Sequence, residues 1–243
     1  MLTIPGTFAS GLLANTTLRH LALVWLVFAV VDITLANVGA DFAVADRLYQ
    51  LEGNGWNWKD NIWLSAVLHE GGRGVSEAMG LATFVALAYA CCSKAHRWLI
   101  RPLGYLFLSV ALSTLSISIL KGLTHMDCPW SLTRYGGETP FIGLLELRPL
   151  SLGSPQCFPA GHASAGYAWL ALFFFLTVTA PRWRWWGLCF GLLMGIVFGV
   201  AQQLRGAHFL SHDIWTGVIC WSVSSVLYIV MFIQTTHGSL ING

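Results

Sequence analysis

The chain has 243 residues, of which 56% are hydrophobic and only 10% are charged. A typical soluble domain contains about 25% charged residues, so this composition excludes a water-soluble fold and indicates an integral membrane protein. The net charge of +2 and the lack of a long basic run give no indication of nucleic-acid binding.

Apolar runs of about 20 residues, the length that crosses a hydrocarbon core of about 30 Å, recur along the chain. We expect six transmembrane helices, at residues 18–39, 75–92, 103–124, 163–180, 187–206 and 212–233. No linker or low-complexity tract divides them, so residues 1–243 are expected to form one all-α, membrane-embedded domain. The first apolar run is too long for a cleaved signal peptide, and we expect it to be retained.

The distribution of Lys and Arg in the loops predicts the orientation in the membrane. The short loops 93–102 and 181–186 carry five basic residues and no acidic ones, whereas the longer loops 40–74 and 125–161 mix both signs. We therefore expect both termini to be cytoplasmic and both long loops to face outward, into the periplasm of a bacterial inner membrane.

Ionisable residues gather at the outer ends of the expected helices. Lys121 closes the third helix, His162 opens the fourth, Arg205 and His208 follow the fifth, and His212 opens the sixth. Ionisable groups at membrane depth are energetically costly and usually functional. Because all five lie on one side of the membrane, we expect them to converge on a single site.

The stretch "CFPAGHASAGYAW" places a Pro-x-Gly-His turn directly before a helix. Backbone N–H groups and the helix dipole favour an anion at such a position, and His162 there can hold a phosphate or protonate a leaving oxygen. Taken alone, the turn is equally typical of a helix cap with an interfacial histidine. Lys121 and Arg205, taken alone, are typical of side chains that extend to the lipid headgroups.

The stretch "RGAHFLSHDIW" contains two histidines four residues apart, a spacing that also suits a metal or haem site with His162 as a further ligand. The fixed positive charges of Lys121 and Arg205 would oppose a bound cation. Histidines surrounded by cations suit an oxyanion better, as in phosphoryl transfer.

Together these residues resemble the three motifs of the type 2 phosphatidic acid phosphatase (PAP2) superfamily, in its bacterial integral-membrane lipid phosphatase branch. The first motif, Lys-x6-Arg-Pro, is found as "KGLTHMDCP", with Cys128 in the position of the Arg. The second, Pro-Ser-Gly-His, is found as "PAGH", with Ala160 in the position of the Ser, and Ser164 can supply that hydroxyl one turn later.

The third motif, Ser-Arg-x5-His-x3-Asp, differs most from the family pattern. If His208 is the motif histidine, Gln202 replaces the Arg and His212 replaces the Asp, while Arg205 lies near the same helical face and is expected to reach the phosphate. If His212 is the motif histidine, Arg205 is one residue out of register and Asp213 lies nearby. We favour His208 as the nucleophile, with His212 in the orienting position.

The resemblance implies a mechanism without metal or cofactor. The motif-three histidine attacks phosphorus to form a phospho-histidine, and His162 protonates the leaving oxygen. Lys121, Gly161 and Ser164 are expected to bind the phosphate together with an arginine. The arginine missing at position 128 has two candidate substitutes, Arg134 and Arg148, of which Arg134 is favoured because it is closer to Lys121 in the sequence.

Two further features belong to the outer loops. Cys128 and Cys157 are the only two of the six cysteines in these loops, and on the oxidising side of the membrane they can form a disulfide. In the first outer loop, His69, Glu70 and Arg73 either contact a headgroup or belong to a solvated loop.

The sequence thus predicts a lipid phosphatase that acts at the outer face of the membrane. Its expected substrate is a phosphomonoester or diphosphate on a lipid or polyprenyl chain, with phosphatidic acid, phosphatidylglycerol phosphate, undecaprenyl diphosphate and a lipid A phosphate as candidates. Three alternatives stay open: a phosphotransferase with a polyprenyl diphosphate donor, a haem- or metal-binding oxidoreductase that uses His162, His208 and His212, and a non-catalytic lipid-binding or transport relative.

Overall fold

The computed structural model describes residues 7–149 and 151–234, and within these ranges the regular elements are helical, with one isolated bridge between Leu132 and Thr139. The α-helices are α1 Thr7–Asn37, α2 Ala40–Leu51, α3 Gly72–Cys92, α4 Ile100–Thr124, α5 Gly161–Tyr167, α6 Ala171–Thr179, α7 Arg184–Leu204 and α8 Leu210–Tyr228. Shorter 3-10 helices are η2 Lys94–Leu99, η3 Pro129–Ser131, η4 Thr133–Tyr135, η5 Ala168–Leu170 and η6 Pro181–Trp183, and π-helices are η1 Trp63–Gly71 and η7 Ile229–Gln234.

Six helical runs within the described ranges are long and apolar enough to cross a membrane. They are Thr16–Asn37, Gly72–Cys92, Lys94–Ser131, Gly161–Thr179, Pro181–Leu204 and Leu210–Ile233. The predicted all-α bundle with six spans is confirmed, and its fourth span is assembled from α5, η5 and α6 in succession.

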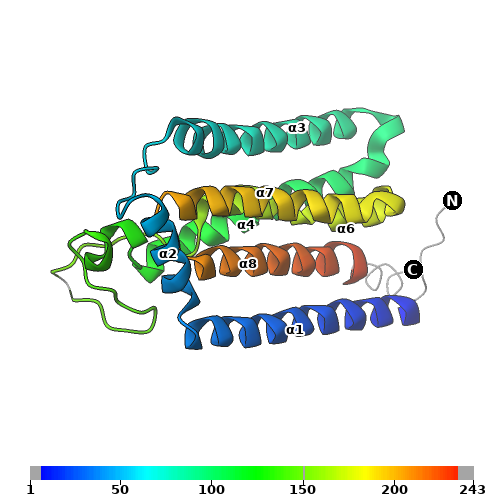
Figure 1. Cartoon of the computed structure of the whole chain (residues 1–243). Coiled ribbons are helices and arrows are strands. Elements are labelled where there is room, and N and C mark those ends of the chain that lie inside the picture. Colours follow the sequence, from blue (N-terminus) through cyan, green and yellow to red (C-terminus); the bar gives the residue numbers. More distant parts are fainter. Residues whose placement is uncertain (1–6, 150, 235–243) are drawn as a thin grey trace.

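The long helices lie roughly side by side, and the loops divide between the two ends of the bundle (Figure 1). At one end lie α2, the segment that follows it and the loop between α4 and α5. At the other end lie the beginning of α1 and the short connection between α3 and α4, which contains η2. The two long loops that the sequence assigns to one side of the membrane therefore meet at one end of the molecule.

Close packing between α7 and the fourth span depends on glycines at every fourth position of α7. A Cβ atom at Gly191 would lie 2.6 Å from the backbone nitrogen of Leu170, and one at Gly195 would overlap the ring of Tyr167. Gly187 meets the backbone of Leu172 in the same way. Without a hydrophobic driving force between helices in lipid, such close backbone approach is a main source of association through van der Waals contact.

Buried hydroxyl groups join α4 to α8. Tyr105 donates a hydrogen bond from its hydroxyl to the Ser224 carbonyl (3.0 Å), and Ser109 donates to the Ser224 hydroxyl (3.0 Å). Large apolar side chains of α1, α3 and α7 are exposed in the isolated chain, as expected for surfaces that contact lipid.

The first outer loop, 40–74, is more ordered than the sequence suggests because it forms α2 and η1. Ala45 of α2 packs in a small cluster with Leu132, Tyr135 and Phe209. Asp46 of α2 accepts two hydrogen bonds from the Arg134 guanidinium (2.8 and 2.6 Å), which hold the pKa of that carboxyl below its usual range. These contacts attach α2 to the second outer loop as a cap over the end of the bundle.

Candidate active site

Lys121 and the Pro-x-Gly-His turn meet at the outer end of the bundle. Lys121 lies in the last turn of α4, and Gly161 and His162 begin α5. A Cβ atom at Gly161 would lie 2.8 Å from the Lys121 Nζ, so glycine at this position is what allows the ammonium group to approach the backbone. Ser164, one turn further on, donates from its hydroxyl to the Gly161 carbonyl (2.6 Å).

His208 and His212 share one hydrogen-bond acceptor, the backbone carbonyl of Cys157. The Nδ1 atom of His208 lies 2.6 Å from this oxygen, and that of His212 lies 2.8 Å from it. A carbonyl oxygen can only accept, and its two lone pairs allow two donors. Both imidazoles therefore carry a proton on Nδ1, and a neutral ring leaves its lone pair on Nε2.

His208 is held in the neutral form. Burial lowers the pKa of His208 well below the ordinary value of 6.5, and the nearby His212, Lys121 and His162 lower it further, whereas the hydrogen bond to Cys157 opposes them. These interactions also place His212, Lys121 and His162 within electrostatic range of His208. A neutral imidazole with a free Nε2 is the form of histidine that can act as a nucleophile.

His212 is more enclosed than its neighbour. Its side chain has no exposed surface and packs edge-on against the rings of Phe158 and Phe209, with centroids 5.1 and 5.4 Å away. Its Nε2 atom has no hydrogen-bond partner among the described residues. His208, in contrast, keeps 7% of its surface exposed.

The sequence places His212 in the orienting position behind His208, and no hydrogen bond joins the two rings among the described contacts. The Nδ1 atom of each ring is directed at the Cys157 carbonyl, and the two ring centroids are 5.7 Å apart. The Nδ1 atoms of both rings donate to the Cys157 carbonyl. His212 therefore cannot use its Nδ1 atom to accept a hydrogen bond from His208. The backbone oxygen of Cys157 is thus the acceptor that faces the Nδ1 atoms of both rings.

Asp213, the other candidate for orienting a histidine, faces α7. It accepts a hydrogen bond from the Gln203 side-chain amide (2.5 Å) and packs against Gly199, where a Cβ atom would lie 2.7 Å from its Cγ. No hydrogen bond from His208 or His212 to Asp213 is present among the described contacts.

Cys128 and Cys157 are joined by a disulfide, with their Cα atoms 5.2 Å apart. The bond connects the segment after α4 to the segment just before the Pro-x-Gly-His turn. Ala160, within that turn, is buried, and its backbone nitrogen donates to the His212 carbonyl (3.3 Å). The first and second motifs and the start of α8 are thus tied to one another.

The three arginines considered as phosphate ligands have other partners in the structure. The Arg205 guanidinium donates to the Lys59 carbonyl (2.7 Å) and to the Gln202 side chain (3.3 Å). Arg134 is paired with Asp46, as described above. Arg148 donates to Asp127 (2.6 and 3.1 Å) and to nearby carbonyl groups of its own loop.

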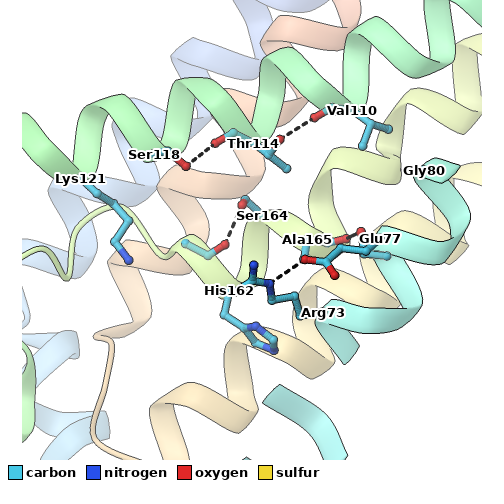
Figure 2. A pocket seen from close by; sticks show the side chains of 12 residues that line it. Arg73, Glu77, Gly80, Val110, Thr114, Ser118, Lys121, His162, Ser164 and Ala165 are labelled. Atoms are coloured by element: carbon cyan, nitrogen blue, oxygen red, sulfur yellow. Dashed lines mark hydrogen bonds and ion pairs between the residues drawn. The ribbon is translucent and has the colours of Figure 1, made fainter. Parts of the chain in front are cut away.

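A cavity of about 530 Å³ opens beside Lys121 and His162, between α3, α4 and α5 (Figure 2). The α4 wall consists of residues spaced along one side of that helix, and the α5 wall includes Gly161 and Ser164. The α3 wall includes Arg73 and Glu77, whose side chains form an ion pair of 2.7 Å. Figure 2 shows this pair and His162 on the same side of the cavity.

Arg73 and Glu77 were the residues that the sequence indicated least clearly. Arg73 was only a candidate headgroup contact, and Glu77 was not identified, although an acidic residue in the second turn of a membrane span is itself a sign of function. Glu70 precedes α3 and is exposed, and the side chain of His69 lies outside the described residues.

The arrangement of the side chains does not support a metal site at the histidines. Within residues 7–149 and 151–234, no three His, Cys, Asp or Glu side chains are close enough together to hold a metal ion. His162, His208 and His212 therefore do not form such a group.

Comparison with known proteins identifies the family. No curated protein and no solved structure matches the chain. The model of the PAP2 superfamily matches residues 102–235, which covers more than half of the chain and includes Lys121, the Pro-x-Gly-His turn and both histidines of the third motif. With the six spans, the match shows that this protein is a multi-pass membrane member of the PAP2 superfamily, a family of phosphatases.

Proposed function

We propose that the protein hydrolyses a phosphomonoester or diphosphate on a lipid or polyprenyl substrate, at the outer face of a bacterial-type inner membrane. The observation that carries the proposal is that Lys121 and His162 line one cavity between membrane spans and that both lie within electrostatic range of a neutral His208. These groups supply the cation, the acid and the nucleophile that phosphoryl transfer requires.

The proposed reaction has two steps. The Nε2 lone pair of His208 attacks phosphorus, the bond from phosphorus to the leaving oxygen breaks, and His162 donates its proton to that oxygen. In the second step His162 takes a proton from water, and the resulting hydroxide attacks the phosphorus of the phospho-histidine. The bond between phosphorus and the His208 Nε2 then breaks. Inorganic phosphate leaves, and His208 returns to its starting form. The fully buried His212 has no surface to offer a substrate, which favours His208 as the nucleophile.

Phosphate binding is assigned to Lys121, the backbone N–H of Gly161 and the guanidinium of Arg73, and the Ser164 hydroxyl joins them once it leaves the Gly161 carbonyl. The Nε of Arg73 donates to Glu77, and its two terminal nitrogens have no partner among the described residues. A guanidinium held in this way presents a fork of donors that suits phosphate oxygens. Arg134 and Arg205 would have to leave Asp46 and Lys59 before they could take this role.

The substrate is proposed to be amphiphilic because the cavity lies between membrane spans. Its α4 wall runs inward from Lys121 through Ser118 and Thr114 to Val110, which is about 16 Å of helix at 1.5 Å per residue. A headgroup phosphate at Lys121 could therefore keep its acyl or prenyl chain in the leaflet. The basic short loops support cytoplasmic termini and a site that faces the periplasm.

The test is phosphate release by the purified protein in lipid nanodiscs, with phosphatidic acid, phosphatidylglycerol phosphate and undecaprenyl diphosphate as substrates. We expect orthovanadate to inhibit the reaction and EDTA to leave it unchanged. His208→Ala should reduce kcat by at least about a thousandfold, because the covalent route is lost. His96→Ala, at the opposite end of the bundle, is the matched control and should retain full activity.

Other outcomes would contradict the proposal in distinct ways. Full activity of His208→Ala together with an inactive His212→Ala would make His212 the nucleophile. Activity that EDTA abolishes would indicate a metal enzyme. Transfer of the label to an added lipid acceptor, without inorganic phosphate, would indicate a phosphotransferase.

A further inference from the structure

The backbone oxygen of Cys157 has an unusual position in the site because it accepts hydrogen bonds from both histidines of the third motif. Its location decides which nitrogen of each ring carries the proton. If this oxygen moved away, the Nδ1 proton of His208 would lose its acceptor in a buried environment, and the ring would be free to adopt the other tautomer. In that tautomer Nε2 carries the proton and cannot attack phosphorus.

Cys157 is held by one backbone hydrogen bond, by a covalent bond and through its buried neighbour Phe158, whose carbonyl accepts from the Thr124 hydroxyl. The segment before α5 is irregular, and the backbone nitrogen of Cys157 donates to the Met126 carbonyl (3.1 Å). The covalent contact is the disulfide to Cys128, which precedes η3. Met126 and Cys128 belong to the same short segment, so both contacts attach Cys157 to the end of α4.

We propose that the Cys128–Cys157 disulfide is a positioning element for catalysis, because it holds the carbonyl that keeps the His208 proton on Nδ1. The inference rests on the proposed role of His208 as nucleophile. In the family pattern, position 128 is an arginine that binds phosphate. In this chain the same position instead contributes a covalent link between the first and second motifs, and the link acts on the third motif through a backbone oxygen.

A consequence is that activity depends on the oxidation state of this cysteine pair. A dithiol reductant breaks the S–S bond, two electrons and two protons convert the two sulfurs to thiols, and the reductant becomes its own cyclic disulfide. Cys157 then loses its covalent attachment and keeps only noncovalent contacts, among them the hydrogen bond from its backbone nitrogen to the Met126 carbonyl, so the acceptor of both Nδ1 protons is free to shift. The enzyme would be active in an oxidising compartment and weakly active when reduced.

The experiment compares the oxidised protein with the same sample after mild dithiol reduction in nanodiscs, with mass spectrometry to confirm that the bond has opened. We expect kcat to fall by at least about tenfold, the usual cost of losing a partner that fixes a histidine tautomer, with KM changed less than twofold, because the phosphate-binding groups remain. Reoxidation should restore kcat. In the 15N spectrum of labelled histidines, the rings of His208 and His212 should both be protonated on Nδ1 in the oxidised protein. In the reduced protein these two rings should show a mixture of tautomers.

Two sets of variants provide the controls. The protein in which exposed Cys91, Cys92 and Cys189 are replaced by Ala should respond to the reductant as the wild type does. Cys128→Ser combined with Cys157→Ser should have the low kcat of the reduced enzyme and no further response to reductant.

The inference is overturned if the reduced wild type, with its disulfide shown to be open, keeps full kcat. It is also overturned if the two histidine tautomers are the same in both oxidation states. Should the oxidised protein hydrolyse none of the substrates, the proposed function fails by itself, and the 15N comparison still decides whether the disulfide positions the histidines.

Discussion

Single atoms decide the chemistry of the histidine pair. Cys157 acts through its backbone oxygen, and this oxygen assigns a tautomer to two rings at once. A family Asp in the place of His212 would bring negative charge behind the nucleophile, whereas a carbonyl brings only a dipole. The site therefore stabilises a developing imidazolium less strongly, and it keeps His208 neutral through burial and neighbouring groups.

The lowered pKa of His208 predicts how the protein responds to acid. As the pH falls through 6.5, an ordinary histidine becomes protonated, but His208 should stay neutral until a lower pH. The unfolded chain then binds a proton that the folded chain does not, so the free energy of unfolding should decrease below pH 6.5. An NMR titration of the His208 ring, assigned by its absence in His208→Ala, measures the pKa directly. A midpoint at or above 6.5 would contradict the expected burial and the influence of His212, Lys121 and His162.

At the level of whole helices, the packing of α7 depends on its glycines. The glycines of α7 recur at every fourth position and let the fourth span approach backbone to backbone. This pattern can be seen in the sequence, but the sequence does not say which helix it faces. The structure directs Gly191 and Gly195 at the fourth span and Gly199 at Asp213 of α8, so α7 is the helix that joins the Pro-x-Gly-His segment to the third motif.

A substitution at Gly191 tests this packing. Gly191→Ala places a Cβ atom 2.6 Å from the Leu170 backbone nitrogen, which cannot move aside without shifting the helix. We expect a loss of about 1–3 kcal/mol in the free energy of unfolding, measured as a lower Tm in detergent. Gly104→Ala on α4 is the control, since its Cβ would meet nothing within 4 Å and should stabilise the helix by up to about 1 kcal/mol. Equal Tm values for the two variants would show that the close approach is absent.

The cavity is a property of the whole molecule, because its walls come from α3, α4 and α5. Arg73 lies 48 residues before Lys121 in the sequence, and only the bundle brings both to one opening. The Arg73 side chain is 72% exposed and forms an ion pair with Glu77. We propose that this arrangement supplies an arginine to a site that has Cys128 in the arginine position of the first motif and, with His208 as the motif histidine, Gln202 in that of the third.

Replacement of Arg73 tests its role in substrate binding. We expect Arg73→Ala to raise KM about tenfold and to weaken orthovanadate inhibition to a similar extent, because a charge-assisted contact to phosphate is worth about 1.5–3 kcal/mol. Arg73→Lys should recover only part of the affinity, since a lysine keeps the charge but lacks the planar fork. Arg47→Ala, an exposed arginine of α2 outside the cavity lining, is the matched control. An unchanged KM in Arg73→Ala would remove Arg73 from the phosphate site.

The sequence by itself determined the membrane environment, the six spans and the family, because long apolar runs and the spacing of Lys121, His162 and His208 follow from local composition and order. Only the tertiary structure decided that Cys157 orients both histidines, that Arg134 pairs with Asp46, and that Arg73 joins the cavity. The physical reason is the same in each case. Backbone oxygens leave no signature in residue type, and the partner of a charged side chain depends on which helices pack together rather than on their distance along the chain.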